Sequence, residues 1–469
     1  TQVGSSAASD VYKRQFLRNG EGVDFPSWVY FAPMTNGQRF RGAFITVTSL
    51  FFMWGFITVM VDALIPRLKD VFELTYLQAG LVQFAWFTAY GVISIPGGRL
   101  IKRMGYKNGI LIGLSLAALG CLIFYPAAST RMFSLFLLAL FVVASGITVL
   151  QVAANPYISV LGPEESASSR LNLAQAFNSL GTTIAPIISA TYLLSDKVKT
   201  GAEQAALAPE TLEAYRLSEA AAVQVPFVVL ALAFLLLAGV IAMVKLPKIL
   251  EGGSAGGSLS EVLKDRRLLA GAAGIFVYVG AEVALGSYMV NYGMNLGVHE
   301  MIEDTPFLRR MAELAGSIKG QTVEGMDPKG KLGVLLTFYW GGAMIGRFIG
   351  AGLMQRIKPG MLLGVFAGLA SLLVMTSMAT AGLTALMALL LVGLCNSIMF
   401  PTIFTLGIEN LGDAKPQGSG VLCTAIVGGA VIPPAFGAMV DASGFALALV
   451  LPLLCYAYIA GFGYFTSRG

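Results

Sequence analysis

Long apolar stretches separated by short polar segments make up most of the chain from about residue 41 to its end. Each is about 20 residues long or more, the length at which a helix crosses the hydrocarbon core of a bilayer. The twelve stretches are residues 41–65, 76–98, 108–129, 132–158, 168–194, 222–246, 268–296, 332–354, 360–381, 383–407, 416–440 and 443–466. The pattern predicts an all-α integral membrane protein with twelve transmembrane helices.

Three longer polar segments interrupt this pattern. Residues 195–221 and 297–331 are predicted to be loops, and the segment 245–267 is basic and rich in Gly and Ser. Such a composition is typical of a flexible linker. The prediction is therefore an N-terminal segment over 1–40, a six-helix bundle over 41–246, a cytoplasmic linker over 247–267 and a second six-helix bundle over 268–469.

A repeated frame relates the two predicted bundles. The pattern P-x-I-x-x-L-G-x-E begins at Pro156, at the end of the fourth stretch, and again at Pro401, at the end of the tenth. A second pair is GRLIKRM at 98–104 and AGLMQRI at 351–357. Repeats of this kind indicate two pseudo-symmetric bundles, and transporters place their substrate at the interface between such bundles.

Composition agrees with a lipid environment. Hydrophobic residues make up 56% of the chain, charged residues 12%, and the mean hydropathy is +0.74. Soluble domains carry about 25% charged residues. The four cysteines all lie in apolar stretches without disulfide or metal-ligand spacing, and we expect neither a metal nor a cofactor.

The basic residues predict the orientation, because cytoplasmic loops carry an excess of Lys and Arg. With both termini placed in the cytoplasm, most basic residues fall on the inner side. These inner residues are Arg99, Lys102, Arg103, Lys107, Arg170, Lys245, Lys248, Lys264, Arg266, Arg267, Arg347, Arg356, Lys358 and Lys415.

The first residues need separate treatment. SSAASDVYKRQ, at residues 5–15, resembles a translated sequencing adapter, so residues 1–15 are interpreted as an artefact. We exclude them from the fold reasoning, and we expect the native chain to start at Met34.

Two carboxylates lie inside apolar stretches and are candidates for proton coupling. A carboxylate inside a span costs about 2.5–3.5 kcal/mol on insertion scales, and burial favours its protonated form. Asp62 lies near the outer end of the first stretch, where pairing with Arg67 or Lys69 is the alternative. Glu282 lies well inside the seventh, with Tyr278 one turn earlier on the same face. Glu282 has no evident buried basic partner, and it could bind substrate, take the proton or anchor a structural hydrogen bond.

Amide side chains in the spans are candidates for substrate binding, because they offer donors and acceptors without charge. Gln151 and Asn155 are four residues apart and therefore share a helix face. Pro156 frees a backbone carbonyl one turn earlier and can kink the helix. The alternative is an interhelical clasp, worth about 0.6 kcal/mol. Gln175 and Asn178 extend the set in the fifth stretch.

Further candidates are spread over both predicted bundles. Asn291 and Asn396 are weaker substrate-binding candidates in the second. Asn172 lies nearer the cytoplasmic end and is interpreted as structural. Aromatic rings can stack on an apolar face of a substrate, and Trp86 and Trp340 are preferred because each lies inside a span near Gly or polar residues. His299, the single histidine, falls in an outer loop, which argues against a histidine proton relay.

Four stretches carry a family resemblance. They are LFFMWGFITVMVDALIP (50–66), LQVAANPYISVLGPEESASSRLNLAQAFNSLGTTIAP (150–186), FVYVGAEVALGSYMVNY (276–292) and MFPTIFTLGIENLG (399–412). With these the chain resembles the fucose:proton symporter family of the major facilitator superfamily, most closely its glucose/galactose transporter branch. The resemblance implies alternating access and proton-driven uptake of a neutral monosaccharide across a bacterial inner membrane.

Three positions bear on what the resemblance implies. The aspartate that is important in fucose permeases aligns with Asp62, which is retained. Gln151 stands where fucose permeases carry a glutamate. Glucose/galactose relatives have the neutral amide at this position, as this chain does. Lys102 stands where the superfamily usually has an acidic residue, so its usual gating salt bridge is not assumed.

The predicted function is secondary transport of a glucose- or galactose-like hexose with protons. Its partners are then the monosaccharide, the proton and the lipid bilayer, with no nucleic acid. A facilitator and a sodium-coupled carrier remain alternatives, because carboxylates also coordinate sodium. A membrane-embedded enzyme would need clustered metal ligands or an activated nucleophile, and neither motif is present. The repeated, proline-containing halves favour a rocking carrier over a channel.

Overall fold

The computed structural model describes residues 37–71, 76–130, 132–192, 206–247, 249, 258–318 and 322–468. Residues Gln38–Gly469 form one compact unit. The adapter-like residues, the rest of segment 1–36 with the expected start at Met34, and linker residues 248 and 250–257 lie outside the described ranges. The described residues are almost entirely helical and contain no strand.

The helices fall into two groups in chain order. The first half of the chain forms α2 (Gly37–Val71), α3 (Tyr76–Met104), α4 (Tyr106–Thr130), α5 (Phe133–Val160), η2 (Glu164–Ser166), α6 (Ala167–Tyr192) and α8 (Pro209–Met243). The second half begins with α9 (Leu259–Val262), α10 (Arg266–Asn295), α11 (Val298–Asp304), α12 (Pro306–Ile318), α13 (Pro328–Leu353) and α14 (Pro359–Ala379). It continues with α15 (Gly382–Asn396), α16 (Met399–Ile408), η3 (Glu409–Ala414), α17 (Lys415–Thr424), η4 (Ala425–Val427), α18 (Gly428–Ala448) and α19 (Val450–Ser467).

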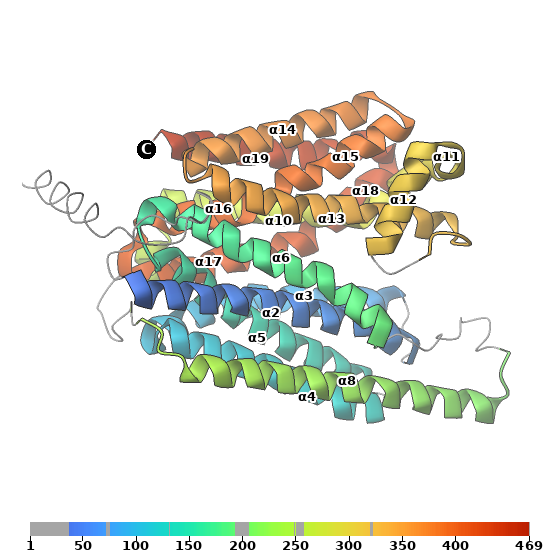
Figure 1. Cartoon of the computed structure of the whole chain (residues 1–469), viewed down its shortest axis with the longest axis horizontal. Helices are drawn as coiled ribbons and strands as arrows, with labels where there is room; N and C mark the ends of the chain where they lie inside the picture. The colour runs from blue at the N-terminus through green and yellow to red at the C-terminus, as the bar shows by residue number, and fades with distance from the viewer. Residues whose placement is uncertain are drawn as a thin grey trace, which may run out of the picture. The chain divides into compact units, whose positions relative to one another are not determined.

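Helical residues cover most of each of the twelve predicted stretches. Within the described ranges, nine helical stretches have the length and hydropathy needed to cross a membrane. One of them runs from Gly382 to Ala448 and covers the predicted tenth and eleventh spans together. Figure 1 shows the long helices lying side by side along one common direction. This is the arrangement expected of a multi-pass membrane protein.

Both segments that were predicted to be long loops are partly helical, so the predicted loops are too long. α8 already begins at Pro209, well inside the predicted loop 195–221. The predicted loop 297–331 contains α11 and α12. In α12 the residues Leu308, Ala312 and Ala315 are buried. Their spacing of three and four residues gives this short helix one apolar face, which the overall polarity of the segment concealed.

The backbone conformation of the repeated frame differs between the two halves. α5 continues through Pro156 as one helix, whereas the corresponding span is divided, with α15 ending at Asn396 and α16 beginning at Met399. Pro401 follows this break by two residues. Proline lacks an N–H and cannot complete the helical hydrogen bond to the residue four positions earlier. Both frames therefore leave a carbonyl that needs another partner.

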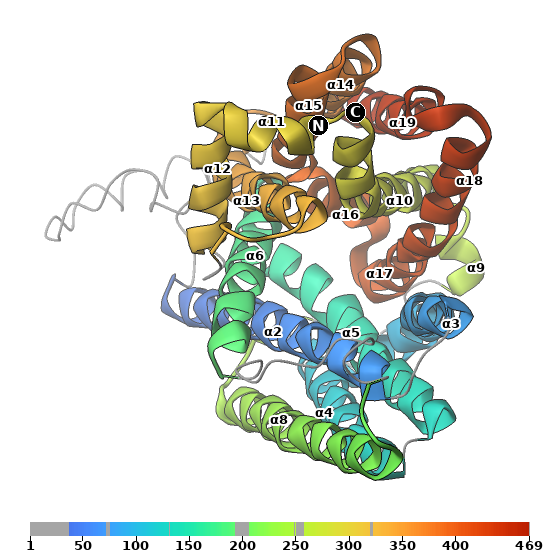
Figure 2. The same ribbon diagram turned by 90° about the vertical axis from the view of Figure 1, so that its right-hand side faces the viewer.

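The two halves meet through equivalent helices (Figure 2). α6 packs against α13 and α16, and α17 packs against α3 and α5. The fifth predicted span of each half thus contacts the second and fourth spans of the other, as a two-bundle repeat requires. The boundaries 41–246 and 268–469 stay a prediction, because all residues from Gln38 onward cluster as one unit.

The contact between α3 and α17 depends on glycine. A Cβ atom added at Gly98 would lie 2.7 Å from the carbonyl oxygen of Pro416. One added at Gly420 would lie 2.6 Å from the carbonyl oxygen of Ser94. Contacts this short exclude any larger residue without displacement of the backbone, so this interface relies on close backbone approach.

The α4–α5 contact yields a stability prediction. A Cβ atom at Gly146 would collide with the backbone nitrogen of Ala117, whereas the space around Gly239 on α8 is open. Gly146→Val should therefore lose about 1–3 kcal/mol of stability through overpacking. Gly239→Val serves as the matched control. Thermal unfolding in detergent should show a lower midpoint for the first variant only, and equal midpoints would contradict the packing described here.

Candidate functional site

The predicted amides of the first half are connected by hydrogen bonds between helices. Gln151 on α5 donates from Nε2 to the Tyr90 hydroxyl on α3 at 2.7 Å. Gln175 on α6 donates to Oδ1 of Asn155 at 3.3 Å. Asn178 donates to the carbonyl oxygen of Phe51 on α2 at 2.9 Å. These amides therefore clasp α2, α3, α5 and α6 together in the present conformation.

One amide group of this set has an unused donor. Asn155 is completely buried, and its Nδ2 atom has no hydrogen-bond partner among the described residues. A buried polar group without a partner costs about 1–3 kcal/mol. A ligand hydroxyl or a water molecule that reached this atom would recover that cost. The free donor of Asn155 therefore points beyond a purely structural clasp.

The predicted polar residues of the second half form a cluster between α10, α13 and α15. The Tyr278 hydroxyl lies 2.8 Å from Oε1 of Glu282 and 3.2 Å from the carbonyl oxygen of Asn396, and it donates to both acceptors. The Asn396 side chain donates to the Tyr339 hydroxyl at 2.8 Å. The Tyr339 hydroxyl donates to the Glu282 carbonyl oxygen at 3.3 Å. The sequence had identified three of these four residues and missed Tyr339.

The same hydrogen bond occurs once in each half. Gln151 and Asn396 each stand five residues before the proline of the repeated frame. Each donates from its amide nitrogen to a tyrosine hydroxyl, which is Tyr90 on α3 in the first half and Tyr339 on α13 in the second. The internal repeat therefore extends from the sequence frame to the hydrogen bonding of the candidate site.

Arg347 joins the two halves at this level, and its assignment to a cytoplasmic loop was wrong. It lies inside α13, where Nε donates to the carbonyl oxygen of Ser397 at 3.1 Å. A terminal guanidinium nitrogen donates to the Ser179 hydroxyl on α6. The guanidinium also interacts electrostatically with the Glu282 carboxylate, so the expectation that Glu282 lacks a basic neighbour was wrong as well. An arginine inside the predicted span 332–354 was the available signal, because a cation there needs partners.

Several predicted residues lie apart from these clusters. Asn291 is exposed, and the Trp340 side chain is 46% exposed with its ring edge-on to Tyr339. Trp86 is half-buried on α3. Asp62 belongs to α2, but its side chain lies outside the part that the structure describes.

One end of the interface between the halves is closed by polar contacts. The hydroxyls of Ser168 and Thr405 are 2.6 Å apart, and Ser169 donates to the carbonyl oxygen of Ala351 at 2.7 Å. An ion pair of 2.9 Å joins Lys415 to Glu164. This is the end that the basic residues assign to the cytoplasm. These contacts join the two halves at this end.

Asn172 lies among these closing contacts. It is completely buried, and its amide nitrogen donates to Oγ1 of Thr402 at 3.2 Å. The same nitrogen contacts the sulfur of Met354 at 3.3 Å. Its contacts link α6 to the second half, which agrees with the structural interpretation.

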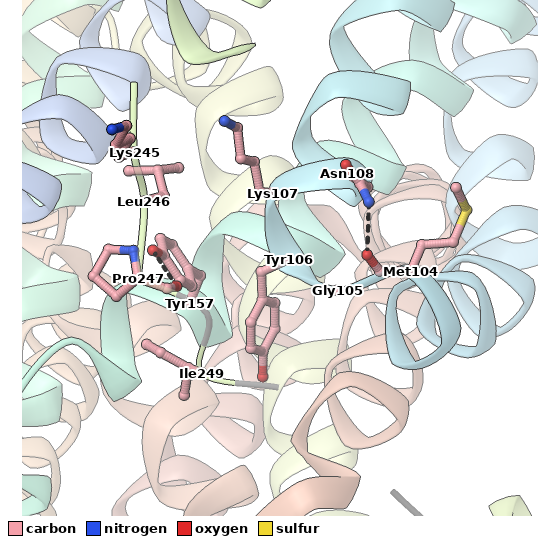
Figure 3. A pocket seen from close by; sticks show the side chains of 10 residues that line it. All are labelled: Met104, Gly105, Tyr106, Lys107, Asn108, Tyr157, Lys245, Leu246, Pro247 and Ile249. Carbon is pink, nitrogen blue, oxygen red and sulfur yellow. Dashed lines mark hydrogen bonds between the residues drawn. The ribbon is translucent and has the colours of Figure 1, made fainter. Parts of the chain in front are cut away.

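A cavity of about 460 Å³ lies near the same end, beside the residues that follow α8 (Figure 3). Lys107 donates to the carbonyl oxygens of Ala242 and Val244 at 2.7 and 2.9 Å. Tyr157 donates to the carbonyl oxygen of Pro247 at 3.1 Å. No predicted site residue lines this cavity. These contacts fix the chain after α8 against α4 and α5, and the cavity is separate from the candidate site.

Comparison with known proteins gives consistent matches along nearly the whole chain. Residues 42–434 match the profile of the family described as the Major Facilitator Superfamily. A glucose/galactose transporter of Brucella abortus is 46% identical over 437 residues, with 92% of this chain and 96% of the relative covered. The L-fucose-proton symporter of Escherichia coli is 36% identical over 434 residues, with 91% and 93% covered.

A solved structure matches as well. The crystal structure of the transporter FucP in the outward conformation superposes with a TM-score of 0.81 at 34% sequence identity. It covers 92% of this chain and all of the solved one.

The second-half cluster yields a testable prediction. Tyr339→Phe removes the hydroxyl that accepts from Asn396 and leaves a buried amide donor without a partner. The expected loss of stability is about 1–3 kcal/mol. Tyr464→Phe is the matched control, because Tyr464 is exposed and its ring contact with Arg468 survives in Phe. Thermal unfolding in detergent should separate the two variants, and an unchanged midpoint for Tyr339→Phe would contradict the proposed cluster.

Proposed function

Because the chain belongs to the major facilitator superfamily, we propose that it is a secondary active transporter that carries a glucose- or galactose-like hexose together with protons. The observation that carries the proposal is the amide–tyrosine hydrogen bond repeated in both halves. In the second half this bond lies beside Glu282, and Arg347 of the same half contacts the first half. A sugar bound at this level would contact both halves. It could therefore favour their movement relative to each other, as alternating access requires.

The chemistry of the site suits a neutral sugar. Amides and phenols supply donors and acceptors for hydroxyl groups without demanding a counter-ion. The Brucella abortus relative, which is 46% identical, is named as a glucose/galactose transporter, and this favours a glucose- or galactose-like hexose over fucose. The proposed sugar-binding residues are Gln151, Asn155, Gln175, Asn178, Tyr278, Glu282, Asn291, Asn396, Trp86 and Trp340.

Not all of these candidates have equal support. The repeated amides Gln151 and Asn396 and the unsatisfied nitrogen of Asn155 have the strongest support. Asn291 and Trp340 are supported only by their place in the predicted spans.

Proton coupling is assigned to Asp62 and Glu282. Glu282 accepts a hydrogen bond from Tyr278, and its carboxylate interacts electrostatically with Arg347. Gain or loss of a proton there would change the net charge at the contact between the halves. The relative named as an L-fucose-proton symporter supports protons over sodium as the coupling ion. The proposed setting is a bacterial inner membrane with both termini in the cytoplasm, as the basic residues indicate.

Asp62→Asn tests the coupling assignment. Proteoliposomes receive radiolabelled glucose under one of three conditions, which are an inward proton gradient, an inward sodium gradient and no gradient. The native chain should accumulate glucose only with the proton gradient. The variant should retain glucose exchange and lose accumulation, because the asparagine cannot carry a proton. Accumulation driven by sodium, or equilibration without accumulation under every gradient, would contradict proton symport.

Gln151→Leu tests the sugar-binding assignment. Loss of one hydrogen-bonding group should weaken galactose or glucose binding about three- to tenfold. Gln224→Leu is the matched control, because Gln224 on α8 donates to Ser129 away from the interface. Binding is measured by isothermal titration in detergent. Equal affinities of the two variants would remove Gln151 from the site.

A further inference from the structure

The proline of the repeated frame in the first half leaves a carbonyl that the second half binds. Pro156 has no N–H, so the carbonyl oxygen of Val152, four residues earlier, has no partner within the α5 ladder. The Ser419 hydroxyl on α17 donates to this oxygen at 2.9 Å, and the contact is buried. The hydrogen bond therefore crosses directly from one half to the other.

The frame proline of the second half leaves a carbonyl in the same way. Pro401 frees the carbonyl oxygen of Ser397, which lies at the break between α15 and α16. Arg347 donates to it from Nε at 3.1 Å. The same guanidinium donates to the Ser179 hydroxyl on α6, in the first half. Here the arginine connects the freed carbonyl to the opposite half.

Both arrangements contain a hydrogen bond between the halves that can be broken without disturbing a helix. A carbonyl inside an intact helix is already bonded to the N–H four residues later. The freed Val152 carbonyl can instead accept from Ser419 of the opposite half or from water. In the second half Arg347 and Ser397 move together, and the bond that crosses between the halves is the one from Arg347 to Ser179. Separation of the halves would replace Ser419 and Ser179 by water and would leave the helix hydrogen bonds as they are. A buried donor or acceptor without either partner would be costly, so each contact favours one of two states.

We propose that two contacts are paired latch points that hold the halves closed on the side assigned to the cytoplasm. One is the bond from Ser419 to the Val152 carbonyl, and the other is the bond to Ser179 from Arg347, which the Ser397 carbonyl holds in position. The proposal rests on the alternating access of the proposed function, but it is independent of which sugar or ion is carried. It also gives the two frame prolines a role distinct from bending a helix.

A double-mutant cycle at Val152 tests the latch. Ser419→Ala leaves the Val152 carbonyl buried without a donor, so the ratio of open to closed molecules at this end should rise about tenfold. Pro156→Ala supplies a backbone N–H that can bond the same carbonyl within α5. In that background Ser419→Ala should change the ratio by less than about twofold. Ser371→Ala is the control, because its hydroxyl donates within its own helix.

Opening is measured without sugar by pulsed electron spin resonance. Spin labels are attached at Arg103→Cys and Lys358→Cys, two exposed positions that end α3 and precede α14. The four native cysteines are buried and are replaced by alanine in all chains. The label-to-label distance lengthens when the halves separate at this end. Size-exclusion profiles and thermal unfolding establish that each labelled variant is folded.

The second interface provides a parallel test. Ser179→Ala removes the acceptor of Arg347 on α6 and should also shift molecules to the longer distance. If Ser419→Ala does not fold, the comparison of Ser179→Ala with Ser371→Ala still tests whether the second latch point holds the halves closed.

The outcomes separate this proposal from the proposed function. A shift for Ser419→Ala that Pro156→Ala suppresses supports the latch. An equal shift in both backgrounds, or no shift for either Ser419→Ala or Ser179→Ala, overturns it. Because the distances are measured without sugar or gradient, a failure to transport glucose leaves this result intact. If the chain shows normal symport but Ser419→Ala shifts the distance equally in both backgrounds, the latch is overturned and the proposed function stands.

Discussion

The structure depends on the rule that a backbone polar group in lipid must find its partner inside the protein. That rule makes every predicted span a helix. It also makes the few positions where a backbone carbonyl has no partner within its own helix important for the structure. Pro156 and Pro401 create two such places. Ser419 of the second half binds the Val152 carbonyl of the first, whereas Arg347 binds the Ser397 carbonyl of its own half and donates to Ser179 of the first. Each freed carbonyl therefore takes part in a contact between the halves.

The candidate site is built next to those two prolines. Gln151 and Asn396 stand one turn or slightly more before the prolines, and each bonds a tyrosine on a neighbouring helix. Glu282 adds a carboxylate, and Arg347 connects its surroundings to α6. In the second half the proposed binding residue Asn396, the titratable Glu282 and the contact between the halves are therefore contiguous. Contiguity of this kind lets a ligand and a proton act on one equilibrium, since each needs only to favour one arrangement of the halves.

Sequence patterns predicted the helices and the repeat, because hydropathy and the proline frame are local properties of the chain. They also identified Gln151, Asn396 and Glu282, since polar residues are costly inside apolar stretches. They did not identify Tyr90, Tyr339 or Ser419, which belong to common residue types and gain a role only from partners far away in the sequence. Arg347 was misplaced because a positive charge near the end of a span was read as an orientation signal. The helix α12 was missed because its apolar face is short and surrounded by charges.

If sugar and protons cross the membrane together, the movement of the protons themselves can be measured. Proteoliposomes in weakly buffered solution, without any imposed gradient, receive galactose or glucose while a pH electrode records the external medium. Symport predicts an alkaline shift on addition of the sugar, abolished by a protonophore and absent with a sugar that does not bind. Entry of labelled sugar without any pH change would contradict the account and would identify the chain as a facilitator or as a carrier coupled to another ion.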